Sequence, residues 1–322
     1  MDSIKSQNVG YWSQNVPGLD GTPEERVKQR AFFEEVDRVR FANEPYLSAM
    51  LDALAAPGQD LLEIGFGLGT DLRHFARRGM RVWGLDFSPE NAFKVATAFQ
   101  LMELPGRIAS GDAEHLPFPD QAFDRVHSWG VLHHTPDTDR TLAEVMRVLK
   151  PGGRFMIMLY HKGYQYAWLR LTYAVCLHWM RKSLEKHISD GYDQSPLSKM
   201  YSVGELRCMF RAFEEVRIEI VTFGGIQHHP VLKWVWRLFN RVPFLMRRFG
   251  SFAVITGRKP EVSAGGAAVP EWRCARCRGA LVEEETGWRC SEAACAMRYP
   301  RYKDAVPVLH PDSADVIERL SP

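Results

Sequence analysis

Short apolar runs alternate with amphipathic stretches through the first half of the chain, and the alternation resumes later. Each apolar run is compact and bounded by turn residues, as expected of a buried strand. The expected strands are 60–65, 80–86, 106–112, 122–130, 154–160, 214–223 and 251–258. Between the first five, apolar residues recur with helical spacing, and the expected helices are 71–78, 89–102 and 138–149. This alternation predicts an α/β fold, a doubly wound, seven-stranded sheet whose strands are mostly parallel.

Several segments flank or interrupt this pattern. Two long insertions leave predicted strands on the side where open α/β sheets bind ligands, so we expect them to form a lid over the site. A Gly/Ala/Pro-rich linker precedes a small cysteine-rich end. The expected divisions are a helical cap at 1–50, an α/β domain at 51–258 with lid insertions at 161–210 and 224–249, a linker at 259–271 and a small domain at 272–322.

The first predicted strand ends in a glycine-rich loop with Gly65, Gly67 and Gly69. This G-x-G-x-G spacing differs from the dinucleotide pattern, and the Gly-Lys-Ser/Thr of a phosphate-binding P-loop is absent. Glu63 precedes the loop and Asp86 closes the next strand. A carboxylate at the second position suits a ribose diol, whereas Glu63 would repel a pyrophosphate and attract a cation. The pair predicts a cationic nucleoside without phosphate, and S-adenosylmethionine has these properties.

Four further motifs follow the loop in order: GLDFSPENA (84–92), GDAEHLPFPDQAFD (111–124), SWGVLHHTPD (128–137) and LKPGGRF (149–155). With the glycine loop, they make the chain resemble the class I S-adenosylmethionine-dependent methyltransferases, in particular the type 11 branch that includes quinone-biosynthesis enzymes. The resemblance covers about residues 50–160 and implies a Rossmann-like fold.

The resemblance also implies a role for each matching position. Glu63 and the loop backbone would meet the amino-acid end of the cofactor, and Asp86 would hold the ribose. Residues after the second and third strands would surround the adenine, and residues at the end of the fourth would line the methionine part. The implied cofactor-binding residues are Glu63, Gly65, Phe66, Gly67, Gly69, Asp86, Phe87, Asp112, Ala113, Ser128 and Trp129.

Methyl transfer from a sulfonium needs mainly alignment of the acceptor and exclusion of water. A general base is required only if the acceptor holds its proton near neutral pH. The candidates for catalytic contact with the acceptor are His133, His134, Tyr160 and His161, which follow the fourth and fifth strands. The alternative for His133 and His134 is a structural loop motif shared across the family.

The substrate class is narrowed by the end of the fourth strand. Methyltransferases of adenine or glutamine nitrogens typically carry Asn/Asp-Pro-Pro-Tyr there, whereas this chain has Ser128-Trp129-Gly130-Val131. We therefore expect a small-molecule acceptor. Two alternatives stay open: methylation of RNA or of a translation protein, and a non-catalytic cofactor-binding partner protein. The acceptor atom and the oligomeric state are not specified by the sequence.

Residues 161–258 are basic, with fifteen Lys and Arg against seven Asp and Glu. Within them, 230–250 interleaves basic and aromatic residues without an acid. It is interpreted as a lid helix with a solvated basic face, as a peripheral membrane contact, or as the wall of a site for an anionic or aromatic substrate. The acidic first half disfavours nucleic acid. The polar start of the chain lacks a signal-peptide core, so a cytoplasmic location is expected.

Four cysteines cluster near the end of the chain: Cys274, Cys277, Cys290 and Cys295. Two close pairs at this separation suit tetrahedral thiolate coordination of a structural Zn²⁺. The stretch around them resembles the zinc-ribbon domain of the methyltransferase-activator family. That resemblance implies a domain that stabilises the catalytic domain or contacts the substrate.

Overall fold

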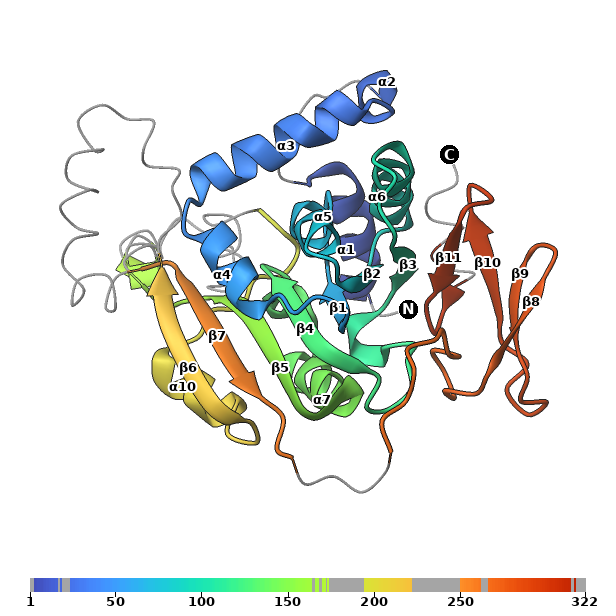
Figure 1. The fold of residues 1–322 in the computed structure, drawn as a ribbon. Helices are drawn as coiled ribbons and strands as arrows, with labels where there is room; N and C mark the ends of the chain where they lie inside the picture. The colour runs from blue at the N-terminus through green and yellow to red at the C-terminus, as the bar shows by residue number, and fades with distance from the viewer. Residues whose placement is uncertain are drawn as a thin grey trace.

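The computed structural model describes residues 3–16, 18, 24–163, 166–167, 170–171, 173, 194–221, 250–261, 266–313 and 316. Half of the first predicted lid insertion, 161–210, and all of the second, 224–249, lie outside the described residues, and so does the basic segment except for its last residue, Gly250. The described chain is built around one twisted sheet with helices on both faces (Figure 1). None of its helices combines the length and apolar character needed to cross a bilayer.

The seven predicted strands form the expected sheet. They are β1 (Asp60–Ile64), β2 (Arg81–Asp86), β3 (Arg107–Gly111), β4 (Phe123–Trp129), β5 (Leu149–Tyr160), β6 (Glu214–Val221) and β7 (Phe252–Arg258). Their order is β6-β7-β5-β4-β1-β2-β3. Strands β1 to β5 are parallel, and β7 runs antiparallel to both β5 and β6. The α/β Rossmann-like prediction is therefore confirmed.

Two apolar cores hold helices against the two faces of this sheet. One contains side chains of α4 (Leu47–Leu54), α5 (Thr70–Arg77) and α6 (Pro89–Leu101). The other contains side chains of α7 (Thr138–Val148) and α10 (Val203–Met209). Figure 1 shows the first group above the sheet and α7 and α10 below it. Because β1 is covered on both faces, all five of its residues are buried, including the acids Asp60 and Glu63.

Local sequence determines where several helices begin. The Ser88 side chain accepts a hydrogen bond from the backbone N–H of Asn91 at the start of α6. Asp137 caps α7 in the same way through the N–H of Arg140. These caps satisfy N–H groups that have no partner within the helix, and so fix where α6 and α7 begin.

The cysteine-rich end forms β8 (Leu281–Glu284), β9 (Gly287–Cys290), β10 (Arg298–Tyr302) and β11 (Val306–Leu309). The sequence predicted a small separate domain but not its docking. Strand β11 pairs in parallel with β3, with Val308 opposite Ser110, and so extends the sheet to eleven strands. Trp272 also packs against Trp83, with ring centroids 4.9 Å apart. The module is thus continuous with the β3 edge of the seven-stranded sheet.

The predicted helical cap contains α1 (Ser3–Gln14), α2 (Glu24–Val27) and α3 (Arg30–Asn43). Helix α1 lies beside α6. It is hydrogen-bonded to the loop that follows β2, where the Ser13 and Ser88 hydroxyls are 2.7 Å apart. Helix α3 contacts α5 and α6. The cap therefore packs on the same side of the molecule as the carboxyl ends of the parallel strands.

Candidate active site

The glycine loop connects β1 to α5 in a backbone conformation that favours glycine. Gly65, Gly67 and Gly69 all have positive φ, at 74°, 54° and 74°. A Cβ on Gly65 would lie 2.3 Å from Val131, and one on Gly69 would lie 2.8 Å from Val95. Gly65 and Gly69 therefore need to be glycine for two reasons: their positive φ and the lack of space for a Cβ.

Glu63 and Asp86 lie on either side of this loop and are both buried. The N–H of Gly67 donates to Asp86 Oδ2 over 3.0 Å, and the N–H of Ser88 donates to Oδ1 over 2.9 Å. Glu63 Oε2, in contrast, has no hydrogen-bond partner in the described part of the chain. Burial, and then the negative charge of Asp71, raise the pKa of Glu63 well above its usual value. An ammonium group would both pair this oxygen and reverse that shift.

A cavity of about 790 Å³ opens over the loop and the ends of the strands. Nine of the eleven predicted cofactor residues line it: Glu63, Gly65, Phe66, Gly67, Asp86, Phe87, Asp112, Ala113 and Trp129. The structure places Gly69 and Ser128 away from it. Ser128 is fully buried and donates to the carbonyl of Ile64 over 2.8 Å, so its side chain joins two strands.

The four predicted catalytic residues separate into two groups. His134 and Tyr160 line the cavity, whereas His133 and His161 do not. His133 is fully buried against Tyr160, with ring centroids 3.8 Å apart, and burial lowers its pKa well below the usual value. His161 donates through Nδ1 to the carbonyl of Gly250 over 2.8 Å. The geometry gives both histidines packing or bridging positions, which favours the structural alternative for His133.

His134 has a defined orientation at the cavity wall. Its Nδ1 lies 2.6 Å from the carbonyl oxygen of Leu197. A carbonyl only accepts, so this contact places the proton on Nδ1 and leaves Nε2 as the basic nitrogen of the neutral ring. The indole of Trp12, from α1, packs against the same ring at a centroid distance of 4.9 Å.

The sequence did not identify the cations of the site. Three described Lys or Arg residues line the cavity, Lys5, Arg26 and Arg40, and all belong to the N-terminal cap. The guanidinium of Arg40 lies 3.6 Å from Asp71 and over the ring of Trp129, 5.6 Å from its centroid. It therefore occupies the end of the cavity where Glu63 lies. No local motif marks these positions, and Arg40 also pairs with the buried carboxylates of Asp71 and Glu44.

The four cysteines converge at the tip of the C-terminal module. The Sγ atoms of Cys274 and Cys295 are 3.6 Å apart, and those of Cys277 and Cys290 are 3.4 Å apart. Four thiolates around one Zn²⁺ with Zn–S bonds of about 2.3 Å would stand about 3.8 Å from one another. A Cβ on Gly279 would lie within 3.3 Å of two of these sulfurs. The donor set and its spacing fit a tetrahedral zinc site.

Comparisons with known proteins agree with this geometry. A family model described as a methyltransferase domain matches residues 62–157. The demethylmenaquinone methyltransferase of Tropheryma whipplei is 29% identical over 186 residues, covering 55% of this chain and 75% of that protein. The ubiquinone/menaquinone biosynthesis C-methyltransferase of Bordetella avium is 41% identical over 109 residues, covering 32% of this chain and 41% of that protein.

Among solved structures, the Haemonchus contortus phosphoethanolamine N-methyltransferase 2, bound to S-adenosylhomocysteine, is 20% identical with a TM-score of 0.48. That match covers 66% of this chain and 52% of the other. The motifs in residues 62–157, the matching family model and the quinone-methyltransferase relatives lead to one conclusion. Residues 62–157 form a methyltransferase domain of the class I S-adenosylmethionine-dependent type, and the chain is an enzyme of that type.

Proposed function

We propose that this enzyme methylates a small-molecule metabolite with an apolar or aromatic body. The observation that carries the proposal is a single cavity lined by the cofactor acids and also by aromatic and aliphatic side chains. Its volume of about 790 Å³ falls in the range of roughly 300–1,000 Å³ typical of small-molecule sites. The apolar lining includes Trp12, Phe32, Val36, Trp129, Tyr160 and Phe252.

The cofactor residues divide between the two ends of the cavity. At the methionine end, Glu63 is placed to accept from the ammonium and Arg40 to pair with the carboxylate. At the nucleoside end, Asp86 would accept from the ribose hydroxyls, with Phe87, Asp112 and Ala113 around the adenine. When bound, S-adenosylmethionine supplies an electrophilic methyl group on a sulfonium. The residues of this chain hold and orient the two reactants and keep water away from them.

The acceptor would lie against the aromatic wall near Tyr160, which stacks on Phe252 with centroids 5.6 Å apart. His134 is the candidate general base, because the carbonyl of Leu197 sets its tautomer. Its role depends on the acceptor: a phenol or a carbon acid requires loss of a proton, whereas a thioether or a tertiary amine does not. A base role predicts that His134→Asn removes the acidic limb of the rate–pH profile.

The acceptor class is tested by incubating the purified enzyme with methyl-labelled S-adenosylmethionine and three fractions of a cell extract: small molecules, RNA and protein. We expect label in the small-molecule fraction, extractable into organic solvent, and its loss in Asp86→Ala. Label confined to RNA or protein would instead support the alternative of an RNA or translation-protein methyltransferase. Label only in strongly polar metabolites would contradict the apolar acceptor.

We also propose that the four cysteines bind one structural Zn²⁺. Four protein ligands leave no open coordination position, so the ion would stabilise the module and take no part in methyl transfer. Metal analysis of freshly purified protein should find about one zinc per chain and much less in Cys290→Ser. The absence of zinc in the unmodified protein would refute this assignment. The cytoplasmic location and the membrane contact through 230–250 stay predictions.

A further inference from the structure

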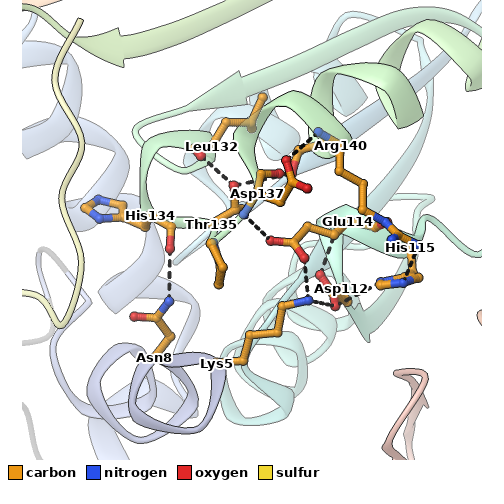
Figure 2. Close-up of polar contacts among 12 residues, drawn as sticks. Lys5, Asn8, Asp112, Glu114, His115, Leu132, His134, Thr135, Asp137 and Arg140 are labelled. Atoms are coloured by element: carbon orange, nitrogen blue, oxygen red, sulfur yellow. Dashed lines mark hydrogen bonds and ion pairs between the residues drawn. The ribbon is translucent and has the colours of Figure 1, made fainter. Parts of the chain in front are cut away.

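Lys5, near the start of α1, lies between two buried carboxylates at the edge of the cavity. Its Nζ is 2.7 Å from Asp112 Oδ2 and 2.6 Å from Glu114 Oε2, as Figure 2 shows. The three side chains are 14%, 7% and 6% exposed. Exposed ion pairs contribute little, but removing one member of a buried set leaves an uncompensated charge. Removing Lys5 would therefore leave two buried carboxylates without their cation.

Each of the two acids also has a structural partner. Asp112 Oδ1 accepts from the N–H of Glu114 over 2.9 Å, next to the end of β3. Glu114 Oε1 accepts from the N–H of Asp137 over 2.8 Å, where α7 begins (Figure 2). Lys5 thus contacts two acids of the loop after β3, and one of them, Glu114, joins that loop to the loop after β4. Both loops contribute lining residues to the cavity.

The rest of α1 is attached to the same edge of the sheet. Asn8 donates through its side-chain amide to the carbonyl of His134 over 3.0 Å. Further along the helix, Asn91 donates to the carbonyl of Trp12 over 3.0 Å. Helix α1 therefore contacts the loops that follow β2, β3 and β4, which all carry predicted cofactor or acceptor residues.

We propose that Lys5 is a positioning residue for the cofactor: its ammonium group holds the Asp112 carboxylate ionised and in place beside the cavity. The inference rests on the proposed role of Asp112 in binding adenine. The single positive charge of Lys5 offsets part of the negative charge of Asp112 and Glu114 and reduces the repulsion between the two buried acids. Cofactor binding then depends on a helix that lies outside the 62–157 methyltransferase match.

The charges around Asp112 agree with this arrangement. Burial alone raises the pKa of Asp112, but the hydrogen bond with His115 and the charge and hydrogen bond of Lys5 outweigh it, and the pKa lies below its usual value. The other charged or titratable groups near these two residues are Glu114 and His115, Arg140 through His115, and His310 and Asp312 after β11. Without Lys5, the two carboxylates would repel each other and one would bind a proton more readily.

The test is the affinity for S-adenosylhomocysteine, measured by calorimetry at pH 8 and pH 6. Lys5→Met should weaken binding about tenfold at pH 8, and the loss should increase at pH 6 as the acid pair takes up a proton. Lys5→Arg keeps the charge and should recover most of the affinity. The control is Lys28→Met, whose side chain is 52% exposed and pairs with Glu25, and which should bind like the unmodified protein.

A double mutant separates positioning from a general structural role. If Lys5 acts through Asp112, then Lys5→Met combined with Asp112→Asn should bind no more weakly than Asp112→Asn alone. Additive losses, or unchanged or tighter binding in Lys5→Met, would overturn the inference. If Asp112→Asn itself binds normally, the adenine assignment fails, which is a different result. Thermal melting of each variant checks that the fold is retained.

Discussion

The charged groups of the cofactor cavity come from two regions of the chain. Local sequence motifs identify the charged residues of one region but not those of the other. Residues 62–157 contribute five of the seven described Asp and Glu residues that line the cavity. The N-terminal cap contributes all three described Lys and Arg residues, Lys5, Arg26 and Arg40. Three of these acids, Glu63, Asp86 and Asp112, lie at or next to the ends of β1, β2 and β3, where local motifs reveal them. The cations reach the site from helices, through packing that no local motif describes.

This comparison predicts that the largest loss of cofactor affinity follows from a change in the motif region. Asp86→Ala removes the proposed acceptor of two ribose hydroxyl hydrogen bonds and the acceptor of the Gly67 and Ser88 N–H groups. We expect S-adenosylhomocysteine to bind at least about a hundredfold more weakly, since hydrogen bonds to a charged group contribute about 1.5–3 kcal/mol each. Calorimetric titration measures the effect, with the α7 surface variant Asp139→Asn as control. A loss of affinity of less than threefold would show that Asp86 does not bind the cofactor.

A second expected effect is a pH dependence caused by Glu63. Burial and the charge of Asp71 raise the Glu63 pKa in the cofactor-free protein, whereas a bound ammonium would lower it. Binding should therefore release protons below the raised pKa, and affinity should fall as the pH falls, by at most about tenfold per pH unit. Calorimetry in two buffers of different ionisation enthalpy counts the protons. Glu63→Gln should abolish the proton release. An unchanged proton count in that variant would show that another group releases the protons.

In the cap, Arg40→Met should weaken S-adenosylhomocysteine about tenfold, because it removes a charged partner of the amino-acid carboxylate. The same variant should bind 5′-methylthioadenosine, which lacks that carboxylate, as well as the unmodified protein does. Arg38→Met, on the same helix but 68% exposed and paired with Glu35, is the matched control. Equal weakening for both ligands would show that Arg40 acts only through its ion pairs with Asp71 and Glu44.

The smallest expected effect is that of Asn8→Ala. This change removes one buried hydrogen bond to the His134 carbonyl and should lower the free energy of unfolding by about 1–3 kcal/mol. Cofactor affinity should change by no more than about threefold, because Asn8 supports the loop after β4 without carrying charge. Denaturant unfolding and calorimetry separate the two quantities. A larger loss of affinity than of stability would give Asn8 a direct role.

The accuracy of the sequence-based predictions varied with how local the determining interactions are. The seven strands followed from apolar periodicity, and the cluster of Glu63, Asp86 and Asp112 followed from acids placed at or next to the ends of predicted strands. His133 and His161 follow strands in the same way, yet they point into packed or bridging positions. The direction of a side chain at a loop depends on what surrounds it, and a single sequence does not encode those neighbours explicitly.

The docking of the C-terminal module could not be predicted from the sequence either. Val306 to Leu309 form a short apolar strand with no indication of its partner, yet β11 pairs with β3 and places Leu309 opposite Gly111, directly before Asp112. Backbone hydrogen bonds can join a strand to any free sheet edge, so register and partner are decided by the shape of both surfaces.

By itself, the sequence determined the fold, the reaction class and the acids of the motif region that line the cavity, because each is marked by residues close together in the chain. Only the tertiary structure decided which cations balance those acids, which histidine reaches the cavity and where the cysteine-rich module attaches. Those features depend on contacts between segments more than 30 residues apart, such as Arg40 with Asp71, Lys5 with Asp112 and Ser110 with His310. Charge and geometry across such distances are set by packing.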